Sequence, residues 1–182
     1  MLPMPSYLQH GIYCFSKARG HARFSYPREV SRLRILFVCH GNICRSTMAE
    51  YVMRDLVRKA GLGQAVVADS AAATHDALGM GVHPGTREVL RRHGIACGGH
   101  RATPLRRSDY ARYDLIVGMD EENRRDMLRI LGGDPQRKVH LLLDWTDSPR
   151  EIDDPWYTCD YDATYADVRR GCEALLAAVA PI

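Results

Sequence analysis

Residues 39–46 read Cys-His-Gly-Asn-Ile-Cys-Arg-Ser and lie between an apolar run, 33–38, and a helix-like segment, 47–59. A strand followed by a short loop that opens a helix is a phosphate-binding arrangement. The loop amides and the helix N-terminus direct positive partial charge at one point. This stretch therefore predicts a strand, an anion cradle and a helix in immediate succession.

A cysteine begins the predicted cradle and an arginine ends it. The positive field of the cradle favours the thiolate form of Cys39. The planar guanidinium of Arg45 can bind two phosphate oxygens at once, which a lysine cannot do. A phosphate held against a thiolate in this way can form a phosphocysteine intermediate.

Three other interpretations of the loop explain fewer of its residues. A cysteine after a buried strand is often a small core residue, but that leaves the glycine, asparagine, arginine and serine of the loop without a reason. A zinc site using Cys39, His40 and Cys44 lacks a second Cys/His pair at ligand spacing, since the next cysteine is Cys97. The G-x-x-x-x-G-K pattern of a nucleotide-binding loop is absent.

Composition indicates one globular domain of ordinary polarity. The chain has 182 residues, of which 46% are hydrophobic and 26% charged. No apolar run approaches the roughly 20 residues of a membrane span. Six cysteines are too few for a disulfide scaffold at this length, so we expect a reduced, cytoplasmic setting.

The basic excess is confined to the N-terminal segment. Residues 1–34 carry six basic side chains against Glu29 alone, and the rest of the chain has 19 basic and 21 acidic residues. Charge therefore gives no support to nucleic-acid binding. Residues 1–31 lack clear periodicity and a secretory apolar segment, so we expect an N-terminal extension with little fixed structure, followed by the domain at 32–182.

From residue 33 onward, strand-like and helix-like segments alternate. This pattern predicts an α/β fold of three layers, in which a four-stranded parallel sheet is flanked by helices and the phosphate loop follows the first strand. The expected strands are 33–38, 64–69, 115–119 and 139–143, with a loop at 70–82. The expected helices are 47–59, 84–93, 108–113, 120–131 and 163–179.

A long polar loop at 144–161 contains the candidate acid. A thiolate that attacks a phosphate ester needs a group to protonate the leaving oxygen. Pro155 biases Asp154 toward an extended conformation, and the loop follows a parallel strand at the edge where the Cys39 loop must also lie. We therefore expect Asp154 to reach the phosphate. Trp156 and Tyr157 are candidates for a wall against which an aromatic leaving group packs.

Five motifs, in family order and spacing, show that the chain from about Leu33 to Ala178 resembles the low-molecular-weight protein tyrosine phosphatases. They are V-C-H-G-N-I-C-R-S at 38–46, D-S-A-A at 69–72, R-R-H-G-I at 91–95, G-M-D-E-E-N at 118–123 and D-P-W-Y at 154–157. The first and last are specific, and the others are supportive.

The resemblance implies metal-independent hydrolysis of phosphotyrosine in proteins, without a cofactor. It implies that Cys39 is the nucleophile, Arg45 the phosphate clamp and Asp154 first the acid and then the base. The remaining implied roles are phosphate binding along the loop, support of the loop's shape, and redox protection by a reversible Cys39–Cys44 disulfide. The residues implied are His40, Gly41, Asn42, Ile43, Cys44, Arg45 and Ser46 for phosphate, and Asn42, Ser46, Ser70 and His93 for support.

Substrate preference is less determined. The family usually carries an aromatic residue after the D-S-A-A motif, in the loop that flanks the active site. Residues 73–78 contain none, so His75 or Leu78 could form that side of the site.

Three alternative functions remain. Protein-arginine phosphatases resemble this chain but tend to have Thr where Ile43 stands, so Ile43 favours phosphotyrosine as the substrate. Arsenate reduction needs two further relay cysteines, and Cys97 stands alone in the equivalent region. A non-catalytic phosphate-binding module has no need for Asp154.

The expected partners are phosphotyrosine-containing proteins and a cognate tyrosine kinase. We expect binding neither to nucleic acid nor to a membrane.

Overall fold

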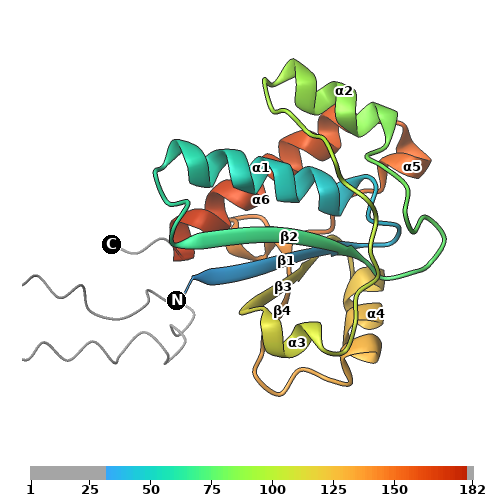
Figure 1. Ribbon diagram of the computed structural model, residues 1–182, viewed down its shortest axis with the longest axis vertical. Coiled ribbons are helices and arrows are strands. Elements are labelled where there is room, and N and C mark those ends of the chain that lie inside the picture. Colours follow the sequence, from blue (N-terminus) through green and yellow to red (C-terminus); the bar gives the residue numbers. More distant parts are fainter. Residues whose placement is uncertain (1–31, 180–182) are drawn as a thin grey trace, which may run out of the picture.

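The computed structural model describes residues 32–179 as a parallel sheet with helices on both faces (Figure 1). The sheet has four strands in the order β2-β1-β3-β4, and every pairing is parallel. Both the fold class and the position of the phosphate loop after β1 are as predicted. The strands are β1 (Leu33–Cys39), β2 (Val66–Ala72), β3 (Leu115–Gly118) and β4 (Val139–Leu141).

Two hydrophobic cores form because the central strands bury side chains on both faces. Ile35 and Phe37 point into the larger core, whereas Leu36 and Val38 point into the smaller one. This alternation follows from the two-residue period of a strand. In Figure 1, α1 (Arg45–Lys59) and α6 (Tyr161–Val179) cover one face, and α3 (Asp109–Arg112) and α4 (Glu121–Leu131) cover the other.

Capping residues set several helix ends at the positions that the sequence predicts. The Asp120 carboxylate accepts a hydrogen bond from the Asn123 amide at 2.6 Å, and Gly132 ends α4 with a φ of 82°. Pro84 opens α2 (Pro84–Arg92), where its missing N–H costs nothing. These ends are as predicted. Ser108 precedes α3 as expected, although its side chain makes no capping hydrogen bond.

Several boundaries differ from the sequence prediction. Strand β2 continues to Ala72, because the register of β1 pairs residues 70–72 with Phe37 to Cys39. Pairing across the sheet thus overrides the weak strand preference of Ser and Ala. Strand β4 stops at Leu141, whose amide donates to the Asp144 carboxylate at 2.9 Å. The chain then turns into a 3-10 helix, Leu142–Trp145.

Two further differences lie close to the predicted acid. The loop at 144–161 contains a short helix, α5 (Pro155–Thr158), and α6 begins at Tyr161 rather than at residue 163. The predictions for the extension at 1–31 and for the last three residues lie outside the described residues. Within residues 32–179, no helix is both long and apolar enough to cross a membrane.

The parallel arrangement decides where functional groups can meet. All four strands end at the same edge of the sheet, so the segments that follow them lie next to one another. These segments are the phosphate loop after β1, residues 73–83 after β2, the start of α4 after β3, and residues 146–154 beyond β4.

Candidate active site

The loop at 40–44 connects β1 directly to α1 and leaves its backbone donors free. Within the described residues, its N–H groups find no acceptor in the protein. Unpaired N–H groups are costly unless water or a ligand accepts from them. Cys39, at the end of β1, and Arg45, at the start of α1, are each 3% exposed. The loop therefore forms a concave set of donors with a sulfur at one end and a guanidinium at the other.

The Arg45 guanidinium is held by three groups from two other segments, the one after β3 and the one beyond β4. Its Nη1 donates to Asp120 Oδ2 at 2.5 Å and to the Ile152 carbonyl at 2.9 Å, and its Nη2 donates to Asp154 Oδ2 at 2.5 Å. Within the described residues, its Nε is buried without a hydrogen-bond partner. Burial alone would lower the pKa of Arg45, but Cys39, Asp154 and Asp120 outweigh it and hold that pKa above its ordinary value. The side chain is therefore a cation, and its Nε–H and the second N–H of Nη2 remain to bind an anion.

Two polar side chains surround the Cys39 sulfur. The Cys39 thiol donates to the Ser46 hydroxyl at 3.1 Å. The Asn42 amide nitrogen also donates to that hydroxyl oxygen, at 3.0 Å. Because the amide nitrogen can only donate, it leaves the hydroxyl hydrogen of Ser46 available to the sulfur once the thiol loses its proton. The arrangement suits a thiolate.

Asn42 anchors the loop in a strained conformation. It is fully buried and has a φ of 56°, in the left-handed region that few non-glycine residues adopt. Its amide nitrogen donates to Ser70 Oγ at 2.8 Å, and its Oδ1 accepts from the Thr103 amide at 3.1 Å. Its carbonyl accepts from Thr47 Oγ1 at 2.9 Å. These bonds hold the strained backbone in place.

The expected role of His93 in this network is wrong, and His100 fills the position. Nε2 of His100 lies 2.8 Å from the Asn42 carbonyl. His93 instead stacks on Tyr165, with 3.8 Å between ring centroids. The reason is the path of the chain. His93 lies at the end of α2, whereas His100 lies in the segment that returns to β2, where Pro104 pairs with Ala72. No local pattern distinguishes the two histidines.

Glu50 extends the network beyond the predicted residues. It is a buried residue of α1 whose carboxylate accepts from the Ser70 hydroxyl. The Ser70 oxygen in turn accepts from Asn42, so a chain of hydrogen bonds links α1 to the loop through β2. The structure thus places three of the predicted supporting residues, Asn42, Ser46 and Ser70, in one hydrogen-bonded group.

Asp154 lies against the guanidinium and also caps α5. Its Oδ1 accepts from the Trp156 amide at 3.0 Å, while Oδ2 accepts from Arg45. Trp156 and Tyr157 follow on α5, with 61% and 85% of their surfaces exposed. The Trp156 ring meets that of His83 edge-on at 6.0 Å between centroids. In the structure, Asp154 therefore contacts Arg45, and the two exposed aromatic side chains follow it on α5.

Asp120 and the Ile152 carbonyl are two site groups that sequence reasoning missed. Asp120 was expected only as a helix cap, yet its second oxygen holds Arg45. A buried arginine needs more than one acceptor, which is the only signal that could have suggested a further carboxylate.

Cys44 is buried next to Cys39 and is protected from ionisation. Burial, together with the charge on Cys39, raises the pKa of the Cys44 thiol to about 12, although Thr86 opposes this. Cys39, Cys44, Cys97, Cys159 and Cys172 are all free thiols. Among residues 32–179, no three His, Cys, Asp or Glu side chains are grouped so as to hold a metal ion.

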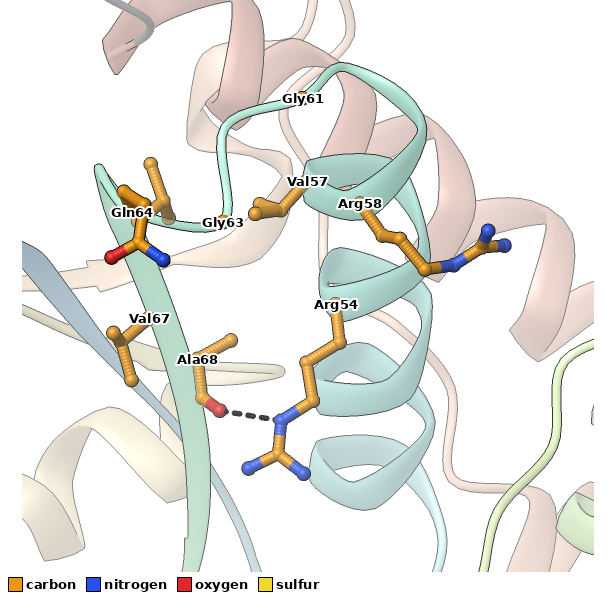
Figure 2. Close-up of a pocket in the computed structure, with 9 residues that line it drawn as sticks. Arg54, Val57, Arg58, Gly61, Gly63, Gln64, Val67 and Ala68 are labelled. Atoms are coloured by element: carbon orange, nitrogen blue, oxygen red, sulfur yellow. Dashed lines mark hydrogen bonds between the residues drawn. The ribbon is translucent and has the colours of Figure 1, made fainter.

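A separate surface hollow of about 500 Å³ lies between α1 and β2 (Figure 2). Arg54 crosses it, and its Nε donates to the Ala68 carbonyl at 2.9 Å. The described residues that line it are arginine, valine, glycine, alanine and glutamine, and none of these is a nucleophile or carries a carboxylate. These lining residues offer no group for nucleophilic or acid–base chemistry, in contrast to the residues at the carboxyl edge of the sheet.

Comparison with known proteins gives one consistent family. The family model described as low molecular weight phosphotyrosine protein phosphatase matches residues 34–181. The chain is 38% identical to the Bacillus subtilis low molecular weight protein-tyrosine-phosphatase YfkJ over 81% of this chain and 96% of that protein. The Homo sapiens low molecular weight phosphotyrosine protein phosphatase is 35% identical, over 81% and 96% of the two chains.

Solved structures agree with this result. The crystal structure of YfkJ superposes with a TM-score of 0.79 and covers 82% of this chain and 95% of that one. A Drosophila arginine phosphatase superposes with a TM-score of 0.73 at 25% identity, covering 82% and 99%.

Replacement of the two histidines separates their roles. We expect His100→Ala to weaken binding of inorganic phosphate about tenfold, because the Asn42 carbonyl loses a donor and the strained loop relaxes. His93→Ala should leave phosphate affinity within about twofold and act on thermal stability instead. Isothermal titration calorimetry with phosphate and thermal unfolding measure the two effects. Equal phosphate affinity in wild type and His100→Ala would contradict the assignment.

Proposed function

The chain belongs to the low molecular weight phosphotyrosine protein phosphatase family, and we propose that it hydrolyses phosphotyrosine in proteins through a phosphocysteine intermediate. The observation that carries the proposal is the position of Arg45. It joins the Cys39 loop to Asp154, so nucleophile, anion clamp and acid surround one point. A module that only bound phosphate would need no carboxylate there.

In the first step, the Cys39 thiolate attacks phosphorus. A sulfur–phosphorus bond forms, the bond to the tyrosyl oxygen breaks, and that oxygen takes a proton from Asp154. The free N–H groups of residues 40–44 and the Arg45 guanidinium stabilise the charge on the three other oxygens. A phenol is a much better leaving group as the neutral alcohol than as the phenoxide.

In the second step, water attacks phosphorus and Asp154, now a carboxylate, accepts its proton. The sulfur–phosphorus bond breaks and the thiolate leaves with the electron pair. Ser46 supports this departure, since its hydroxyl lies 3.1 Å from the sulfur and can donate to it. The positive charge required comes from Arg45 and the backbone, so we propose that the reaction needs neither metal nor cofactor.

Contact with Arg45 also places the carboxylate of Asp154. In the ligand-free protein that carboxylate accepts from both Arg45 and the Trp156 amide. A bound phosphate dianion competes with Asp154 for the guanidinium, so substrate binding frees one carboxylate oxygen to face the leaving oxygen.

Tyrosine is the preferred side chain in this proposal. Ile43 is 8% exposed and packs with Ala77 and Ala102, so it adds no polar group to the loop. Trp156 and Tyr157 supply exposed aromatic surface beside the acid. Phosphoarginine is the second candidate, because the fold also resembles an arginine phosphatase from Drosophila.

The proposal extends to partners and compartment. Phosphotyrosine-containing proteins would be the substrates, and a cognate tyrosine kinase would produce them. A thiolate nucleophile requires a reducing setting such as the cytoplasm, which agrees with the five free thiols in the described residues.

Three enzymes compared in the presence of a chelator test the mechanism. We expect Cys39→Ser to reduce kcat on p-nitrophenyl phosphate roughly a thousandfold or more. Asp154→Ala should reduce kcat on phosphotyrosine by about 10²- to 10⁴-fold, but less on p-nitrophenyl phosphate, whose leaving group needs a proton less. Full activity of Cys39→Ser, or loss of wild-type activity in chelator, would refute the mechanism.

Substrate class is tested with paired peptides. Wild type should hydrolyse a phosphotyrosine peptide at least about tenfold faster, in kcat/KM, than the same peptide with phosphoarginine, a difference of about 1.4 kcal/mol. Ile43→Thr should narrow this difference, because it introduces a hydroxyl able to contact a guanidinium. A faster reaction with phosphoarginine would assign the chain to the second candidate.

Cys44 provides a redox safeguard in the same proposal. Peroxide converts the Cys39 thiolate to sulfenic acid, and the Cys44 thiol then displaces water to form a disulfide. Negative charge on Cys39 contributes to the raised pKa of Cys44, so sulfenic acid formation removes one obstacle to ionisation of Cys44. A reducing thiol then restores both groups.

Peroxide treatment followed by dithiothreitol tests this safeguard. Wild type should recover most of its activity, whereas Cys44→Ser should recover several-fold less, because its sulfenic acid oxidises further. Cys159→Ser, which replaces an exposed cysteine, serves as the control and should recover like wild type. Recovery of Cys44→Ser equal to that of wild type would exclude the role.

A further inference from the structure

The segment that follows β2 is fastened to the phosphate loop at both ends. At its start, the Ala73 and Thr74 amides donate to the Cys39 and His40 carbonyls at 2.9 and 3.0 Å. At its far end, the His83 amide donates to the Ile43 carbonyl at 2.9 Å. Residues 73–83 therefore form a wall beside the loop, and their position is set by the loop itself.

One carboxylate on this wall is held next to the phosphate loop. Asp76 Oδ2 lies 3.0 Å from Nε2 of His40 and accepts from Thr74 Oγ1 at 3.0 Å. The Thr74 hydroxyl also lies within 3.2 Å of the His40 carbonyl. Asp76 is thus tied to a loop residue both directly and through Thr74.

The same carboxylate is open to solvent. The Asp76 side chain is 74% exposed, and within residues 32–179 its Oδ1 has no hydrogen-bond partner. Hydrogen bonds from Thr74 and His40 hold the pKa of Asp76 below its ordinary value, so it is ionised at neutral pH. A fixed negative charge with a free oxygen therefore stands at the mouth of the site.

Apolar surface lies on the same turn. Leu78 and Met80, two and four residues after Asp76, are 36% and 54% exposed. A lysine or arginine side chain has an aliphatic stem and a charged head, and it can cover apolar surface while its head meets a carboxylate. An acidic side chain in the same place would be repelled by Asp76.

We propose that Asp76 is a specificity-determining residue that selects phosphotyrosine with a lysine or arginine beside it in the substrate. The inference rests on the proposed function for the phosphate site and adds the charge of the neighbouring residue. Exposed ion pairs contribute little each, so the preference should be about two- to fivefold in kcat/KM per basic residue. It should also weaken as salt is added, because exposed charges are screened.

Phosphotyrosine peptides that differ only in the flanking residues provide the test. The flanking residues are Arg, Ala or Glu, and each rate is divided by that on p-nitrophenyl phosphate, which has no flanking residues. Wild type should prefer Arg over Ala over Glu. Asp76→Asn should bring the three rates together, and Asp76→Lys should reverse the order. Raising NaCl from 0.05 to 0.5 M should reduce the wild-type differences.

A matched control removes one exposed, ion-paired carboxylate elsewhere. Glu173 pairs with Arg169 on α6, twelve residues after the start of that helix, and it has no contact with the phosphate loop among the described residues. Glu173→Gln should therefore keep the wild-type preference of Arg over Ala over Glu. No preference in wild type, or the same preference in Asp76→Asn, would overturn the proposal.

Binding separates this proposal from the proposed function. The same peptides are titrated against the Cys39→Ser variant, where affinity is measured without hydrolysis. An Arg-over-Glu preference that Asp76→Asn abolishes in this background supports the role of Asp76 even if the wild type hydrolyses none of the peptides. Equal affinities refute it even if hydrolysis is efficient.

Discussion

The hydrogen bonds and ion pairs of the buried Arg45 guanidinium hold the site together. It starts α1 directly after the phosphate loop, yet its acceptors come from the segments after β3 and β4. A buried cation is costly unless several acceptors surround it, so its position requires Asp120, Ile152 and Asp154 to converge. One side chain thereby ties the segments after β1, β3 and β4 together and holds Asp154 beside the phosphate loop.

A second set of bonds maintains the shape of the loop. Asn42 adopts a left-handed backbone conformation and is held by Ser70, Thr103, Thr47 and His100. These partners come from α1, β2 and the segment that returns to β2. The strain at one residue is therefore supported by three segments that meet near the end of β2. Such preorganisation suits charge stabilisation, since the donors need not reorganise during a reaction.

Local sequence was sufficient for residues whose roles depend on neighbours in the chain. Cys39 and Arg45 lie in one eight-residue motif at 39–46, and Asp154 precedes a proline that directs it to an extended conformation. The alternation of apolar and amphipathic segments predicted the parallel sheet. Sequence failed where partners were distant. His93 has the local character of a site residue, but α2 carries it toward Tyr165, and His100 replaces it.

Periodicity and short motifs were enough to predict the class of fold and the phosphate loop, and to nominate Cys39, Arg45 and Asp154 as nucleophile, clamp and acid. The contacts of Arg45 with Asp120 and Ile152, of Asn42 with His100, and of His40 with Asp76 became visible only in the folded chain. These contacts join segments separated by tens of residues. Whether they form depends on the order and register of the strands, which local patterns do not specify.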